Sequence, residues 1–108
     1  MNETELRGII LQKYYEHRRE RSFLPESDNF NPPIDKIDIL CISDQLAQHG
    51  MLEEWKPRKY CGKNSDPYII DSLGGRITAF GIDVVEGEAT PDIKVIFMEN
   101  KTINFNGS

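Results

Sequence analysis

The sequence predicts a single α+β domain in which helices come first and a β-hairpin follows. Two observations carry this expectation. Apolar residues recur at helical spacing before Gly50, and short runs rich in β-branched and aromatic residues replace that pattern after it. The chain has 108 residues, of which 29% are charged and 38% hydrophobic, and this composition suits one globular domain with a modest core.

The N-terminal segment predicts a helix from about residue 3 to residue 20. Asn2, with Glu5 three residues later, forms a variant of the capping box. An apolar stripe at helical spacing follows, made of Leu6, Ile10 and Tyr14. Pro25 sets the limit beyond which this helix cannot continue.

A loop and two further helices are expected next. Residues 22–33 contain many proline, asparagine and serine residues, which are typical of loops. The apolar stretch after them predicts a short helix near 33–37 and a longer helix near 38–49. Asp38 can cap the longer helix, and Gly50 is a natural residue for its end.

After Gly50 the chain has the features of strands. The run "MLEEWK" at 51–56 predicts a strand, and residues 76–78 predict the strand that pairs with it. "PYIID" adds a short strand between them. Thr78 can then cap a short helix that contains Phe80, Ile82, Val84 and Val85.

Two alternating runs close the sequence, at 92–98 and 102–106, and both predict short strands. A two-stranded ribbon is marginal in water by itself. We therefore expect these strands to pair with the hairpin or with a second copy of the chain. The expected organisation is a domain over 1–88 and a C-terminal β extension or dimerisation tail over 89–108.

The order helix, short helix, helix, strand, long loop, strand is that of a winged helix, in which a three-helix core carries a β-hairpin wing. Three stretches resemble small bacterial and phage winged-helix (winged helix-turn-helix) proteins. "CISDQLAQHGMLEEWKP" resembles the last helix of such a domain running into its wing. "GRITAFGIDVVEG" is similar to the "ITxxGxDxxE" ending of that group, and "MNETELRGIILQKYYEHR" resembles the first helix of its uncharacterised members.

The resemblance covers about half of the chain and implies a winged-helix fold. Some relatives continue with Asn/Gly-rich repeats of the kind "NVQIGNNN", which look like self-assembly motifs. This chain has Asn104-Phe105-Asn106-Gly107-Ser108 at that point and lacks the repeat. The segment between Pro57 and Gly75 is also longer than a wing of this group requires.

A basic stretch, "KPRKYCGK" at 56–63, is the first candidate site. It carries four cations and no acid, and these candidate DNA-binding residues are Lys56, Arg58, Lys59 and Lys63. A positive hairpin tip can lie along a phosphate backbone. The alternative is a solvated loop whose charges only keep the protein soluble.

The helix expected at 38–49 is the second candidate site. Its exposed positions should be Asp38, Ser43, Asp44, Gln45, Gln48 and His49. Gln45 and Gln48 are suited to adenine edges in a major groove. Asp38 and Asp44, however, would face phosphates unfavourably, and no lysine or arginine lies between residues 37 and 55 to compensate.

The sequence carries no signature of a cofactor, a metal or an enzyme. Its cysteines and histidines (Cys41, Cys61, His17 and His49) lack the paired spacing of zinc ligands. We expect Cys41 to pack in the core. "SLGG" at 72–75 lacks the lysine and hydroxyl residue of a phosphate-binding loop.

Two functions remain open. The leading hypothesis is a small DNA-binding or regulatory domain that acts as a homodimer on double-stranded DNA. The alternative is a protein-interaction or self-assembly module, which uses the winged helix as a platform for a protein partner and the C-terminal strands for oligomerisation. The net charge of −5 favours the alternative. The polar start "MNETELRG" and the absence of a long apolar run predict a cytoplasmic protein with no membrane segment.

Overall fold

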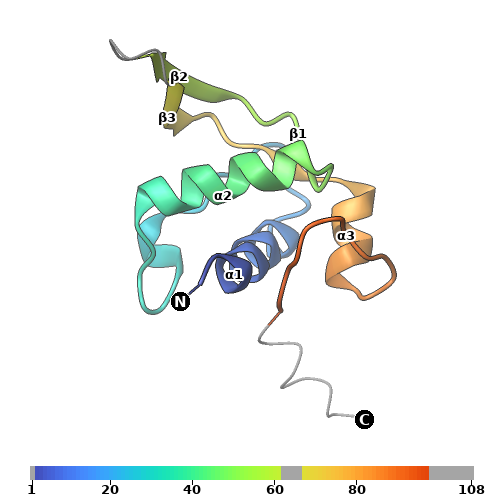
Figure 1. The fold of residues 1–108 in the computed structure, drawn as a ribbon. Helices are drawn as coiled ribbons and strands as arrows, with labels where there is room; N and C mark the ends of the chain where they lie inside the picture. The colour runs from blue at the N-terminus through green and yellow to red at the C-terminus, as the bar shows by residue number, and fades with distance from the viewer. Residues whose placement is uncertain (1, 62–66, 98–108) are drawn as a thin grey trace.

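The computed structural model, drawn in Figure 1, describes residues 2–61 and 67–97. Its elements, in chain order, are α1 (Glu3–Glu16), the 3-10 turn η1 (Ser27–Asn29), α2 (Lys36–Gln48), β1 (Leu52–Glu53), β2 (Pro57–Cys61), β3 (Pro67–Ser72), β4 (Arg76–Ile77) and α3 (Ala79–Val85). Three helices and two small antiparallel sheets make an α+β fold, compatible with a winged-helix-like domain that carries a wing.

The inner sheet of the wing confirms the pairing predicted from the sequence. β1 and β4 run antiparallel, with Leu52 opposite Ile77 and Glu53 opposite Arg76. β1 is shorter than the predicted strand 51–56. Glu54 has a φ of 57°, a left-handed conformation that an extended strand cannot contain.

The outer sheet corrects the interpretation of residues 56–63 as a loop. β2 pairs antiparallel with β3 over Pro57–Cys61 and Pro67–Ser72, so most of the basic stretch belongs to a strand. Pro57 stands at the first position of β2, where a strand tolerates the missing N–H. The segment that is long for a wing therefore forms a second hairpin, which extends beyond the inner sheet (Figure 1).

The helical part differs from the prediction at three boundaries. α1 ends at Glu16 rather than residue 20, and the ring of His17 stacks on Phe23 with 3.9 Å between centroids. The short helix expected at 33–37 does not form, because Asp35 has an extended conformation and is the N-cap of α2. Asp38, the predicted cap, therefore lies in the first turn of α2.

The third helix of the domain follows the wing instead of preceding α2. Thr78 caps α3 as predicted, because its Oγ1 accepts a hydrogen bond from the Gly81 N–H at 2.9 Å. Gly50, the predicted end of the long helix, has a φ of 81°. This left-handed conformation is favourable for glycine after a helix.

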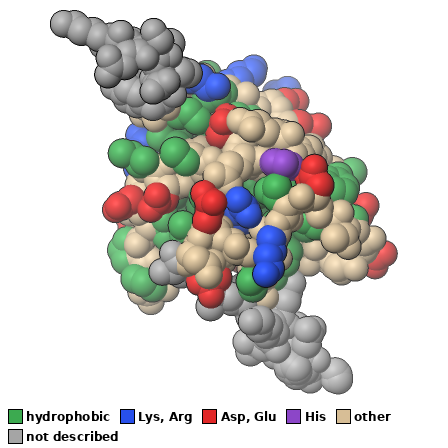
Figure 2. Space-filling view, viewed as in Figure 1, with side chains coloured by type: hydrophobic (Ala, Val, Ile, Leu, Met, Phe, Trp, Pro, Cys, Tyr) green, Lys and Arg blue, Asp and Glu red, His purple; other side chains and the backbone are tan. Residues whose placement is uncertain are grey.

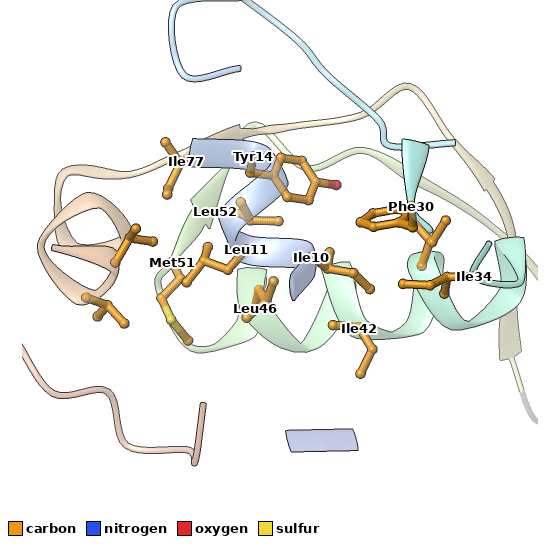
Figure 3. Close-up of a cluster of buried hydrophobic side chains, with 13 residues drawn as sticks. Ile10, Leu11, Tyr14, Phe30, Ile34, Ile42, Leu46, Met51, Leu52 and Ile77 are labelled. Atoms are coloured by element: carbon orange, nitrogen blue, oxygen red, sulfur yellow. The ribbon is translucent and has the colours of Figure 1, made fainter. Parts of the chain in front are cut away.

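The core lies between α1, α2 and the inner sheet (Figure 3). Ile10, Leu11 and Leu46 are completely buried at its centre. The buried cluster also contains Tyr14, Phe30, Ile34, Ile39, Ile42, Met51, Leu52, Ile77, Val84 and Val85. The helical stripe predicted for α1 thus supplies Ile10 and Tyr14 to the core.

Residues 89–97, here called the C-terminal strap, cross α1 after α3. The strand predicted at 92–98 is not formed over residues 92–97, and both residue 98 and the predicted strand 102–106 lie outside the described residues. The alternating pattern has another cause, since Ile93, Val95 and Phe97 pack against the helical core. The strap crosses so closely that a Cβ on Gly8 would lie 1.8 Å from the Ile96 carbonyl oxygen.

One hydrogen bond inside the core gives a first prediction. The hydroxyl groups of Tyr14 and Ser43 lie 2.9 Å apart, and both residues are buried. Burial raises the pKa of Tyr14 above its ordinary value, and the hydrogen bond to Ser43 offsets part of this rise. Tyr14→Phe should lower the free energy of unfolding by about 1–3 kcal/mol, because the Ser43 hydroxyl would lose its partner. Urea denaturation of this variant, of Ser43→Ala and of the double variant measures the coupling. Additive losses would show that the pair contributes nothing.

Candidate functional site

The outer face of α2 is the first candidate site, and it differs from the exposed face that was predicted. Ser43 is buried against Tyr14 rather than exposed. Gln45 is held from both ends of its amide: Nε2 donates to Glu3 at 3.0 Å, and Oε1 accepts from the Arg7 Nε at 2.9 Å. The polar atoms of Gln45 are therefore bound by α1 in this structure, and base reading by Gln45 stays a prediction.

The other end of this face connects α2 to the wing. Asp44 accepts a hydrogen bond from the Trp55 indole N–H at 2.9 Å and another from the Gln48 amide at 2.7 Å. Gln48 is exposed, and its side-chain amide forms this hydrogen bond within α2. His49, at the end of α2, contacts the strap through Asp92 at 2.7 Å. Asp44 thus fixes the base of the wing against α2.

Cys41 corrects another expectation, because it is an exposed free thiol on this face rather than a core residue. Partial burial raises the pKa of the thiol, and the carboxylates of Asp38, Asp44 and Glu3 raise it further. The exposed part of α2 is therefore acidic around Cys41. Ile37, one turn earlier, is 68% exposed.

The basic side of the wing is the second candidate site. Lys56, Arg58 and Lys59 are exposed as predicted, whereas Lys63 lies outside the described residues. Arg58 faces Asp71 across the hairpin, with Nη2 and Oδ2 at 3.2 Å, and Lys36 of α2 approaches the other oxygen at 3.4 Å.

Asp71 therefore neutralises part of the positive charge of the wing. The pKa of Asp71 is lowered by the Ser72 backbone N–H and by Lys36, with a smaller effect of Arg58. Because the Arg58 side chain remains 71% exposed, this pair is solvated and holds Arg58 only weakly.

Hydrophobic side chains also reach the surface of this region. Leu73, in the return from the outer to the inner sheet, is 79% exposed, and Ile70 of β3 is 42% exposed. In Figure 2 hydrophobic side chains gather below the outer end of the wing, while acidic and basic side chains are interspersed over the rest of the face. The view offers no continuous basic surface.

A pocket of about 460 Å³ lies beside α1, next to Phe97 of the strap. Its apolar lining comes from Gly8, Ile9, Phe30, Pro32, Ile34 and Phe97. Its polar lining comes from Gln12, Lys13, Glu16, Asn29 and Asn31. Lys13 pairs with Glu16 at 3.1 Å, so these two charges balance one another.

Within the described ranges, no group of three or more histidine, cysteine, aspartate or glutamate residues is placed to hold a metal ion. Likewise, none of the described helices has the length and apolar character needed to cross a membrane. Comparisons with protein-family models, with curated proteins and with solved structures found no match to this chain.

The close crossing of the strap over α1 was not predicted from the sequence. The sequence carried one sign of this crossing, because Gly8 interrupts an otherwise strong helix-forming segment. A glycine at such a position often marks a close approach of another backbone. Nothing in the local sequence, however, indicates which segment approaches.

Proposed function

We propose that this chain is a protein-interaction and self-assembly module with a winged-helix-like fold. One observation carries the proposal: on the outer face of α2, which a DNA reader would place in the major groove, the side-chain amides of Gln45 and Gln48 both form hydrogen bonds within the chain. Gln45 is bound by Arg7 and Glu3. The residues around Cys41 on this face are carboxylates, which phosphates repel.

The same face suits a protein partner. Ile37 is exposed on it beside Asp38 and offers an apolar contact that water solvates poorly. A hydrogen bond from Trp55 to Asp44 joins the base of the wing to this helix, so one partner could contact both elements. Of the two proposed activities, binding of a protein partner and self-association, only self-association can be measured on the chain alone.

A DNA-binding function is the second candidate. It is supported by the exposed cations of β2 and by Lys56, which lies just before this strand. Lys56 and Lys59 have no ion-pair partner among the described residues, and Arg58 is held only by the solvated pair with Asp71. A wing with these groups could contact phosphates without reading bases. Its affinity would then fall steeply with salt.

Titration with random genomic DNA fragments separates the two functions. We expect the wild-type protein to retain no fragment at low or moderate salt, because the acidic platform repels phosphates. Light scattering over a concentration series should at the same time reveal self-association.

Retention of fragments by the wild-type protein at low salt would contradict the proposal if the double variant Arg58→Glu, Lys59→Glu lost this retention and kept its fold. The matched control is Arg19→Glu with Arg21→Glu, which changes the charge equally at exposed positions outside the wing. Loss of binding in both double variants would indicate a non-specific effect of net charge.

A further inference from the structure

The outer sheet of the wing has one exposed face and one face that is partly buried. Arg58 lies opposite Asp71 in this sheet. The pairing continues one residue beyond the strands, since the Leu73 N–H donates to the Lys56 carbonyl at 3.2 Å. Side chains alternate between the two faces of paired chains, and burial follows this alternation, because Ser72 is buried whereas Leu73 is 79% exposed. The side chains of the exposed face, here called the wing face, are those of Lys56, Arg58, Asp71 and Leu73.

The wing face already holds one carboxylate between two cations. One oxygen of Asp71 lies 3.2 Å from Nη2 of Arg58, and the other lies 3.4 Å from Nζ of Lys36, the first residue of α2. The Lys56 ammonium has no ion-pair partner among the described residues. Lys36, Lys56 and Arg58 therefore contribute three positive charges to this region, and Asp71 compensates only one of them.

Leu73 adds an apolar group to these charges. Its position is fixed through its backbone, because its N–H binds Lys56 and its carbonyl accepts a hydrogen bond from the Ser22 hydroxyl at 2.8 Å. Its side chain contributes little to the core, since most of it is exposed to solvent. An exposed apolar side chain held beside cations has the composition of a small protein interface, which combines an apolar centre with a polar rim.

We propose that the wing face binds an acidic segment of a partner protein, whose carboxylates pair with Lys56 and Arg58 and whose apolar side chain covers Leu73. The inference rests on the proposed protein-interaction function and names the chemistry of the partner. The local excess of positive charge selects an acidic segment, because complementary charges favour the encounter and exclude wrong partners. Leu73 favours a protein over a nucleic acid, since charged and polar groups make the contacts to a phosphate backbone.

The acidic groups of α2 limit where the carboxylates of the partner can lie. Asp38 follows Lys36 by two residues, and the negative charges of Asp38 and Asp44 both act on the exposed thiol of Cys41. These charges would repel an acidic segment that continued along α2. The carboxylates of the partner therefore belong on the wing, and a contact of the partner with the exposed Ile37 would be apolar.

Fluorescence anisotropy with the full chain tests the wing face. The probe is a labelled synthetic peptide in which glutamates flank a pair of leucines, and the comparison peptide has serines in place of the leucines. We expect the leucine peptide to bind more tightly. Leu73→Ala should raise its dissociation constant about tenfold, because the variant loses apolar area that the peptide covers. Arg58→Glu should raise it by about the same factor, whereas the matched control Arg19→Glu, at an exposed position outside the wing, should change it little.

Asp71→Asn gives a second test with the opposite sign. Asparagine keeps the side-chain oxygen that accepts the Ser72 N–H at 2.8 Å, but it lacks the charge that occupies Arg58 and Lys36. The acidic peptide would then bind these cations without an internal competitor, so its dissociation constant should fall about threefold. Asp83→Asn on α3 is the matched control, since it changes the net charge equally at an exposed position outside the wing.

Three outcomes would overturn the inference, and they bear differently on the proposed function. Equal binding of the two peptides would reduce the interaction to charge attraction, with no part for Leu73. Tight binding of a DNA duplex that Arg58→Glu abolishes and Leu73→Ala leaves unchanged would assign the wing to nucleic acid, and the proposed function would fail with it. If neither peptide binds at low salt while light scattering shows self-association, the wing face is excluded and the proposed function stands.

Discussion

Replacing Leu46 with alanine should lower the free energy of unfolding by about 2–5 kcal/mol, which is a large part of the stability of a domain of this size. Leu46 is completely buried in the helix that carries the candidate platform. Its truncation leaves a cavity between α2 and α1, and close-packed neighbours fill such a cavity only in part. Urea denaturation followed by circular dichroism measures the loss.

Leu73→Ala is the matched control, since it removes the same atoms from a side chain that is 79% exposed. Its effect should stay within about 0.5 kcal/mol. Equal losses at the two positions would contradict the described core. A loss at Leu73 alone would indicate that the surface near the wing is buried in an assembly.

The second large effect on stability is expected for Gly8→Ala, and its direction is opposite to the one that helix propensity predicts. Alanine favours a helix interior over glycine by about 1 kcal/mol, so Gly8→Ala would stabilise α1 in isolation. In the folded chain the new Cβ would lie 1.8 Å from the Ile96 carbonyl oxygen, which belongs to backbone and cannot rotate away. We expect the variant to be destabilised by about 1–3 kcal/mol and the strap to move from α1.

Denaturation measures the stability of this variant, and trypsin cleavage after Lys94 reports release of the strap. Gly87→Ala is the control, because its added Cβ meets nothing within 4 Å and only the positive φ of 82° opposes it. This control should cost about 1 kcal/mol and leave Lys94 protected. A stabilised Gly8→Ala variant would show that the strap does not cross α1 where it is described.

Elements whose cause is local could be predicted from the sequence. The capping box at Asn2 and Glu5 is present, and so are the left-handed Gly50 just after α2 and the cap of α3 at Thr78. Each depends on residues within one or two turns. The pairing of β1 with β4 was also predictable, because two strand signals separated by a loop have few other partners.

The rest depends on contacts between distant segments. Alternation in the strap predicted a strand that is not formed over residues 92–97; its apolar residues pack on the helical core instead, and a period of two does not distinguish such packing from pairing in a sheet. Gln45 appeared available for bases because Arg7 and Glu3, which bind it, lie on another helix. The exposure of Cys41 was missed because apolar residues surround it in the sequence.

The division of the wing into an inner and an outer sheet also affects how quickly the chain can fold. Leu52 and Ile77 are far apart in the sequence, and joining them directly would close a long loop. The outer hairpin of β2 and β3 closes a short loop by itself and brings the ends of the inner strands together. Since each halving of a loop saves about 0.6 kcal/mol of closure entropy, chain entropy favours formation of the outer hairpin before the inner sheet joins the helices.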